Sequence, residues 1–217
     1  MLSLDLGIMG SNTTASHTSL PIFSCNNHLL ELVMNRNFND DWQIFSDSEV
    51  FYLVLDGSMN LHLGGGRTKE INRGEYILIK EDTPFMLSDK EGCNYLAIHK
   101  KSYNRDFCTE PKEKADILHG NFLNDLSFQP LQLNNHLIQL IYTKDFSSEE
   151  AFLDSDRAVF VIEGELVLAD VYGEEILNSQ EIANIPAHAF HRVHCREKTL
   201  GFTLQKMDTR IMYLDKK

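Results

Sequence analysis

Residues 158–164 read AVFVIEG, a run of β-branched, aromatic and aliphatic side chains that ends in an acidic residue and Gly164. Such a run is typical of a buried strand, and glycine suits the chain reversal after it because only glycine takes a positive φ without steric cost. The pattern predicts an all-β protein, because comparable runs bounded by turn residues recur at 49–55, 76–79, 94–98, 136–142, 165–168 and 201–204.

One segment departs from this pattern. Residues 110–126 combine Pro111, a Lys-Glu-Lys stretch and an apolar pair, which indicates a helix or a helical turn.

Two stretches occur twice along the chain in the same order. FYLVLDG at 51–57 resembles AVFVIEG at 158–164, and NNHLLELV at 26–33 resembles NNHLIQLI at 134–141. Because the two likenesses are colinear, the chain is predicted to be an internal repeat of one unit. We expect an N-terminal extension and a C-terminal tail around two units joined by a connector, with the boundaries 1–18, 19–101, 102–120, 121–206 and 207–217.

Each expected unit continues from its glycine to a proline-containing turn. The second unit carries NIPAHAFHRV at 184–193, and the first carries RGEYILI at 73–79 followed by Thr83, Pro84 and Phe85. This order of strand, glycine hairpin and proline turn resembles the two half-motifs of the cupin family. The resemblance covers most of the chain and implies a bicupin, that is, two tandem jelly-roll barrels that each consist of two antiparallel sheets.

The resemblance also implies where a metal would bind. Metal-binding cupins use two histidines separated by one residue, then a glutamate, then a third histidine after the proline turn. Neither region before Gly57 or before Gly164 holds the histidine pair, Arg157 stands at the glutamate position, and Phe85 replaces the third histidine of the first unit. Only His191 matches a ligand position, and a catalytic cation needs about three protein ligands. We therefore predict no cofactor, with a divalent transition metal at His191 as the alternative.

The spacing of His188, His191 and His194 leaves a second route to a metal site. On a helix, residues three apart lie on neighbouring turns and could share a metal. On a strand, His191 lies on the face opposite the other two. The expected turn and strand favour His191 lining a pocket or capping a buried hydrogen bond, with His188 and His194 facing solvent.

Arg157 and His191 are thus the candidate pocket residues, and they suit an anionic small molecule. The leading hypothesis is a small-molecule-binding or regulatory protein without a complete metal site. The alternative is an enzyme that uses the second barrel, either a metal-dependent oxygenase or a sugar isomerase or epimerase with His191 as base. Serine-nucleophile chemistry is not indicated because no Gly-x-Ser-x-Gly occurs, and the neighbours His194 and Cys195 would point to opposite faces of a strand.

Net charge and composition limit the classes of partner that we expect this protein to bind. A net charge of −12 opposes nucleic-acid binding, and no apolar run approaches the ~18 residues that cross a bilayer. The four cysteines are widely spaced, which is consistent with reduced thiols and a cytoplasmic location. Residues 2–6, LSLDL, alternate like an added strand, with a frayed terminus as the other possibility. We expect a homodimer, because barrel sheets expose strand edges that associate.

Overall fold

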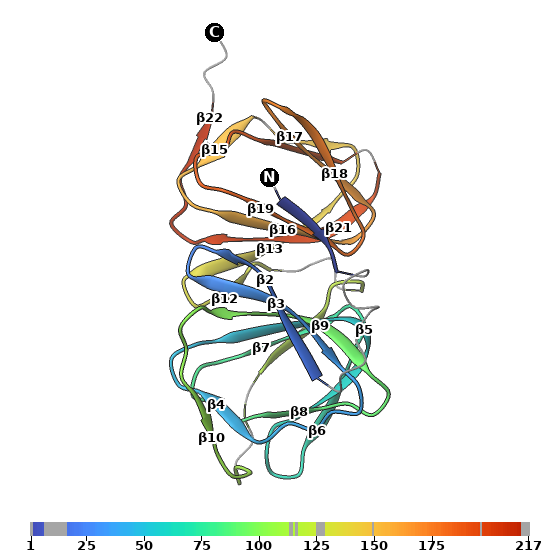
Figure 1. Ribbon diagram of the computed structural model, residues 1–217, viewed down its shortest axis with the longest axis vertical. Helices are drawn as coiled ribbons and strands as arrows, with labels where there is room; N and C mark the ends of the chain where they lie inside the picture. Colours follow the sequence, from blue (N-terminus) through green and yellow to red (C-terminus); the bar gives the residue numbers. More distant parts are fainter. Residues whose placement is uncertain are drawn as a thin grey trace. The chain divides into compact units, whose positions relative to one another are not determined.

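The computed structural model describes residues 2–6, 17–112, 115, 117–124, 129–148, 150–195 and 197–213. The chain divides into two compact units, which we call the first unit (residues 10–125) and the second unit (residues 126–217 together with residues 1–9). All the elements assigned over the described residues are strands, so the prediction of an all-β protein is confirmed (Figure 1). This part of the chain includes no helix that is long and apolar enough to span a membrane.

The first unit has one large sheet around a long central strand. Its main path runs β11-β7-β5-β9-β3-β2, and β6 and β8 pair with the far end of β5, while β4 pairs separately with β10. The strands are β2 (His17–Cys25), β3 (His28–Asn35), β4 (Gln43–Phe45), β5 (Val50–His62), β6 (Thr68–Asn72), β7 (Glu75–Ile79), β8 (Met86–Ser88), β9 (Cys93–Lys100), β10 (Arg105–Phe107) and β11 (Leu118–Asn121).

The described residues of the second unit form three sheets. They run β1-β19-β16-β21-β13-β12, β14-β20-β17-β18 and β15-β22. The strands are β1 (Leu2–Asp5), β12 (Leu131–Leu133), β13 (His136–Thr143), β14 (Phe146–Ser147), β15 (Ala151–Leu153), β16 (Arg157–Glu163), β17 (Glu165–Asp170), β18 (Gly173–Asn178), β19 (Glu181–Ile185), β20 (Arg192–Cys195), β21 (Thr199–Lys206) and β22 (Ile211–Tyr213).

The longest sheets of the two units have the same strand order. Strand β5 lies between β7 and β9 in the first unit, and β16 lies between β19 and β21 in the second. The registers also correspond: Phe51 pairs with Ile98 and Ala158 pairs with Leu204. Each unit therefore offers equivalent positions at which the side chains of the two can be compared.

Strand β1 takes the outer place in the second unit that β11 takes in the first. It pairs antiparallel with β19, with Leu2 opposite Asn184 and Asp5 opposite Glu181, and Figure 1 shows it beside β19. Leu6 follows it and is buried. The N-terminal segment thus forms the added strand that its alternation suggests.

The helix expected within 110–126 is not formed in the described part of that segment. Leu118–Asn121 is instead strand β11, whose residues pair with β7. Pairing with β7 outweighs the weak local helical signal, since tertiary contacts routinely override propensity. Strand β10 and all but the last residue of β11 fall within 102–120, where the sequence suggests a connector, and both pair with strands of the first unit.

Side chains that alternate along the strands fill the interior of each unit. In the first unit, Tyr52 of β5, Ile77 of β7 and Phe85 pack in one apolar cluster. In the second, Val159 of β16 and Leu168 of β17 belong to a corresponding cluster. Burial of these side chains contributes about 1.5–3 kcal/mol each, which is what holds the sheets of a unit together.

Histidines open equivalent strands and are fully buried. His28 begins β3 and His136 begins β13, and the Nδ1 atoms lie 3.0 and 2.7 Å from the side-chain oxygens of Asn27 and Asn135. Because an amide oxygen only accepts, Nδ1 carries a proton in both. Burial, with a smaller contribution from Lys206, lowers the pKa of His136 from 6.5 to about 4.

Glycines allow two backbone segments to approach each other closely at Gly57, within β5, and at Gly164, directly after β16. Gly57 has φ 74° and Gly164 has φ 90°. A Cβ at Gly57 would collide with the backbone oxygen of Gly92, and one at Gly164 would collide with that of Lys198. Gly66 has a similar φ of 69°, but a Cβ there would meet nothing within 4 Å.

We predict that Gly57→Ala destabilises the protein more than Gly66→Ala. Both substitutions place alanine at positive φ, which costs about 1–2 kcal/mol, and Gly57→Ala adds an overlap worth about 1–3 kcal/mol. Equilibrium denaturation of the two variants measures the difference. Equal losses in the free energy of unfolding would contradict the close approach at Gly57.

We also predict that His136 makes the fold sensitive to acid. Between pH 6.5 and about 4 the unfolded chain binds a proton at this histidine that the folded chain excludes, so the free energy of unfolding falls as the pH is lowered. His136→Gln should reduce this loss by on the order of 2 kcal/mol. The exposed His188 offers a matched control, because His188→Gln should leave the pH dependence unchanged. A His136→Gln profile that matches the wild-type profile would show that another group is responsible.

Candidate functional site

Arg157 and His191 reach the same cavity from different parts of the second unit. Arg157 is the first residue of β16, and its Nε and Nη2 donate to Oε1 of Gln205 on β21, at 2.9 and 2.6 Å. His191 immediately precedes β20, and its backbone forms an antiparallel bridge with Ala151 of β15. Both side chains line a cavity of about 430 Å³ with Phe146, Ser147, Ser148, Ala151, Leu153, Ile211 and Tyr213.

His191 is a neutral imidazole at neutral pH. Its side chain is 4% exposed, and Nδ1 lies 3.0 Å from the carbonyl oxygen of Ala189. A carbonyl only accepts, so the proton is on Nδ1 and Nε2 has a lone pair. Burial lowers the pKa of His191 below its usual value, and the positive charge of Arg157 acts in the same direction against the hydrogen bond to Ala189.

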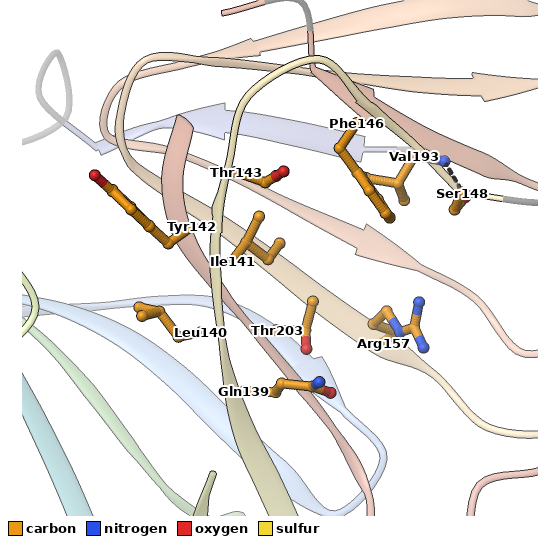
Figure 2. A pocket seen from close by; sticks show the side chains of 10 residues that line it. All are labelled: Gln139, Leu140, Ile141, Tyr142, Thr143, Phe146, Ser148, Arg157, Val193 and Thr203. Atoms are coloured by element: carbon orange, nitrogen blue, oxygen red, sulfur yellow. Dashed lines mark hydrogen bonds between the residues drawn. The ribbon is translucent and has the colours of Figure 1, made fainter. Parts of the chain in front are cut away.

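Arg157 also lines an adjoining cavity of about 390 Å³. Its walls are mainly apolar or hydroxyl-bearing, and the Val193 amide there donates to Ser148 Oγ at 2.9 Å (Figure 2). The remaining lining residues are Gln139, Leu140, Ile141, Tyr142, Thr143, Phe146 and Thr203. The second unit thus combines one guanidinium, one neutral imidazole and aromatic side chains around hollow space.

The residues around His191 do not fit a metal centre. Among the described residues that line its cavity, His191 is the only histidine, cysteine, aspartate or glutamate. Arg157 stands in the same cavity, and its guanidinium repels cations. Over the described parts of the chain no three such residues gather closely enough to hold an ion.

The three histidines of residues 188–194 are separated by the turn. His188 is exposed and has φ 63° in the turn before β20, where its amide donates to the Leu153 carbonyl at 2.7 Å. His194 lies on β20 and is half-buried, with an Nδ1 atom that has no hydrogen-bond partner within the described residues. His188 faces solvent as expected, whereas His194 does so only in part.

Phe85 is the structural counterpart of His191 in the first unit. Its backbone bridges Gln43 as that of His191 bridges Ala151, and its ring is fully buried in the apolar cluster. An aromatic hydrocarbon replaces an imidazole at this position, so the first unit has no equivalent of the imidazole that lines the His191 cavity.

The first unit nevertheless contains a polar cavity of about 400 Å³ that sequence reasoning missed. Glu31, Asp40, His99 and Arg105 all line it. These residues are far apart in the sequence and belong to none of the family's motif positions. The available signal was the alternation of Tyr95 and Ala97 along the strand predicted at 94–98, continued by His99 just beyond it, which points these side chains to one face.

No protein-family model matches this sequence, and no curated protein has significant similarity to it. Its fold has clear counterparts among solved structures. A cupin 2 conserved barrel domain protein from Leptotrichia buccalis superposes with a TM-score of 0.70 at 16% identity, covering 98% of this chain and 96% of that one.

Two enzymes share the same architecture at lower identity. Salicylate 1,2-dioxygenase from Pseudoaminobacter salicylatoxidans, in complex with gentisate, gives a TM-score of 0.73 at 7% identity and covers 99% of this chain and 86% of that one. Oxalate decarboxylase from Bacillus subtilis gives 0.59 at 9% identity and covers 99% and 78%. Identities this low establish the architecture alone: this chain has the jelly-roll fold of the cupin-barrel proteins.

Proposed function

We propose that this protein binds a small organic anion in the second unit, with Arg157 as the charged contact. The observation that carries the proposal is that Arg157 lines both of the cavities described above, while none of their described lining residues is Asp or Glu. A guanidinium donates two parallel hydrogen bonds to a carboxylate or phosphate, and a low-dielectric wall strengthens that attraction.

The apolar walls indicate what the rest of the ligand is. Phe146 lines both cavities, and Val193 and Tyr213 each line one. Volumes of about 390 and 430 Å³ lie within the usual range for small-molecule sites. A carboxylate with a compact apolar body matches this combination of charge, size and lining.

A binding role is better supported than catalysis by His191. An imidazole base in an enzyme is normally oriented by a carboxylate, and in this protein the Ala189 carbonyl holds Nδ1 instead. Tyr213 lines the same cavity, but no carboxylate does so among the described residues. The isomerase alternative therefore lacks one of its three groups, and the oxygenase alternative lacks a fitting set of metal ligands.

We further propose that the chain is a bicupin that arose by duplication, supported by the equal strand order of the two long sheets.

A cytoplasmic location and a homodimer are also proposals. The exposed side chains of Ile211 and Tyr213 on β22 offer apolar surface for a second copy. Sedimentation equilibrium tests the dimer, and a mass equal to that of one chain would exclude it.

We predict that Arg157→Met weakens binding of an organic anion by at least tenfold, which corresponds to about 1.4 kcal/mol. Gentisate and salicylate are suitable first probes because a neighbour in fold was solved with gentisate. Isothermal titration calorimetry of the full chain measures the affinity. Arg192→Met is the matched control: it also removes one cation, but Arg192 faces Glu174 at 4.0 Å and lines neither cavity.

Two results would refute the proposed site. One is wild-type protein that binds neither these probes nor inorganic phosphate. The other is binding that Arg192→Met weakens as much as Arg157→Met does, because the anion would then respond to net charge alone.

We also predict that anion binding strengthens as the pH is lowered below neutrality, because a histidine with a lowered pKa gains its proton only in acidic solution. A bound anion raises the pKa of His191, so binding takes up a proton and is favoured by acid. Titration with salicylate at several pH values, repeated with His191→Gln, checks this linkage. An affinity that depends equally on pH in both proteins would place the proton elsewhere.

A further inference from the structure

The cavity of the first unit is lined by polar groups from several strands. Glu31 of β3, His99 of β9 and Arg105 of β10 line it together with Asp40 and with Gln43 of β4. Three tyrosines, Tyr52, Tyr95 and Tyr103, add hydroxyl groups and aromatic surface. Such a density of fixed polar groups in a cavity of about 400 Å³ is unusual for a space that only fills a core.

Each acidic group of this cavity contacts a basic one, and His17, whose Nδ1 lies 2.6 Å from Asn35 Oδ1, is a further histidine in the lining. Glu31 Oε2 lies 2.9 Å from His99 Nε2, and Arg105 Nη2 donates to both oxygens of Asp40 at 3.0 Å. His99 Nδ1 lies 2.7 Å from the Lys100 carbonyl, which only accepts, so Nδ1 also carries a proton. The hydrogen bond from His99 is the main cause that lowers the pKa of Glu31.

These two ion pairs set the charge of the ligand. An anion could contact His99 or Arg105 only by displacing Glu31 or Asp40, which already contact these two side chains. A cation that entered the cavity would meet the basic groups of His99 and Arg105. A neutral ligand avoids both costs, because paired ions still offer it hydrogen-bond acceptors and donors. Because each carboxylate already contacts a basic side chain, the lining favours an uncharged polar molecule.

The side-chain oxygen of Gln43 is a hydrogen-bond acceptor that has no donor within the described residues. Its side chain lines the cavity, and the residue is only 2% exposed. Its Nε2 donates to Asp40 Oδ2 at 2.7 Å, while its Oε1 has no hydrogen-bond partner within the described residues. Buried acceptors without a partner are costly, and a ligand hydroxyl would satisfy this one.

Aromatic rings beside these polar groups complete the lining. The Tyr103 ring packs edge-on against His99 at 4.5 Å and against Phe45 at 4.9 Å between ring centroids. Tyr52 and Tyr95 are buried and pack edge-on against each other at 5.4 Å. A ligand with hydroxyl groups along one edge and C–H groups on a face complements such walls.

Equivalent positions of the two units carry different charges. The registers match Glu31 with Gln139 and His99 with Gln205, and they match Val50 with Arg157. Where the first unit has the contacting pair Glu31 and His99, the second unit has two neutral amides. Where the second unit has the cation Arg157, the first unit has the apolar Val50. The cavity of the first unit and the two described cavities of the second unit are therefore suited to ligands of different charge.

We propose that the cavity of the first unit is a second binding site, which takes a neutral polyhydroxylated molecule such as a monosaccharide or a polyol. Gln43, Asp40 and Glu31 hydrogen-bond its hydroxyl groups, and Tyr103 packs against its C–H face. The site is independent of the anion site proposed for the second unit.

Trp42 gives a built-in reporter for this site. It is the single tryptophan of the chain and precedes Gln43 directly. Titration of the full-length protein with glucose, galactose, ribose and xylitol, followed by Trp42 emission and by saturation-transfer NMR, detects binding. Glucuronate, glucosamine and serine serve as anionic, cationic and zwitterionic comparison probes.

Saturable binding of at least one neutral probe, tighter than any charged probe, is the expected result. Gln43→Met removes the free acceptor and should weaken this binding about five- to tenfold, as the loss of one buried hydrogen bond does. Ala97→Leu fills the cavity from β9 and should abolish it. Arg157→Met changes only the second unit's cavities and should leave it unchanged.

The thermal midpoint of each variant shows whether it is folded, and the ranking of probes with wild-type protein stands even if one variant is not. The proposal is overturned if no neutral probe binds saturably or if a charged probe binds more tightly. It is also overturned if folded Ala97→Leu binds as the wild type does. Loss of binding in Arg157→Met would move the site to the second unit.

Discussion

The register between each central strand and its neighbour determines what the interior of a unit contains. Side chains alternate between the two faces of a strand, so one shift of register would exchange every inward residue for an outward one. In the first unit this register places Tyr52 opposite Ala97, and both side chains line the polar cavity. In the second it places Val159 opposite Thr203. The core and the candidate sites of each unit therefore depend on the same backbone hydrogen bonds.

Strand positions could be predicted well from the sequence because the apolar runs are short and bounded by turn residues. The run at 158–164 became β16 and the connection to β17, which lies in a different sheet, and the run at 136–142 became β13. The segment containing Leu118 was misjudged, since its few helical features are local whereas its pairing with β7 is not. Long-range pairing of a short edge strand leaves almost no trace in a single sequence.

The candidate sites were predictable only where a motif marks them. His191 and Arg157 lie at positions that the proline turn and the central strand identify, and the structure brings them to one cavity. The contact between Glu31 and His99 joins residues of β3 and β9, and nothing in either segment alone signals it. Pairs of this kind require the strand register, which sequence reasoning did not supply.

The place of strand β1 in the chain affects the order in which the sheets can form during synthesis. This strand precedes the first unit in the chain and so leaves the ribosome before that unit, yet its partner β19 follows the first unit. The residues of the first unit are synthesised after β1 and before β19. Strand β1 therefore has no partner strand during the time in which the first unit can fold. The second unit therefore finishes its long sheet late, through a contact of very large sequence separation, and such contacts slow folding.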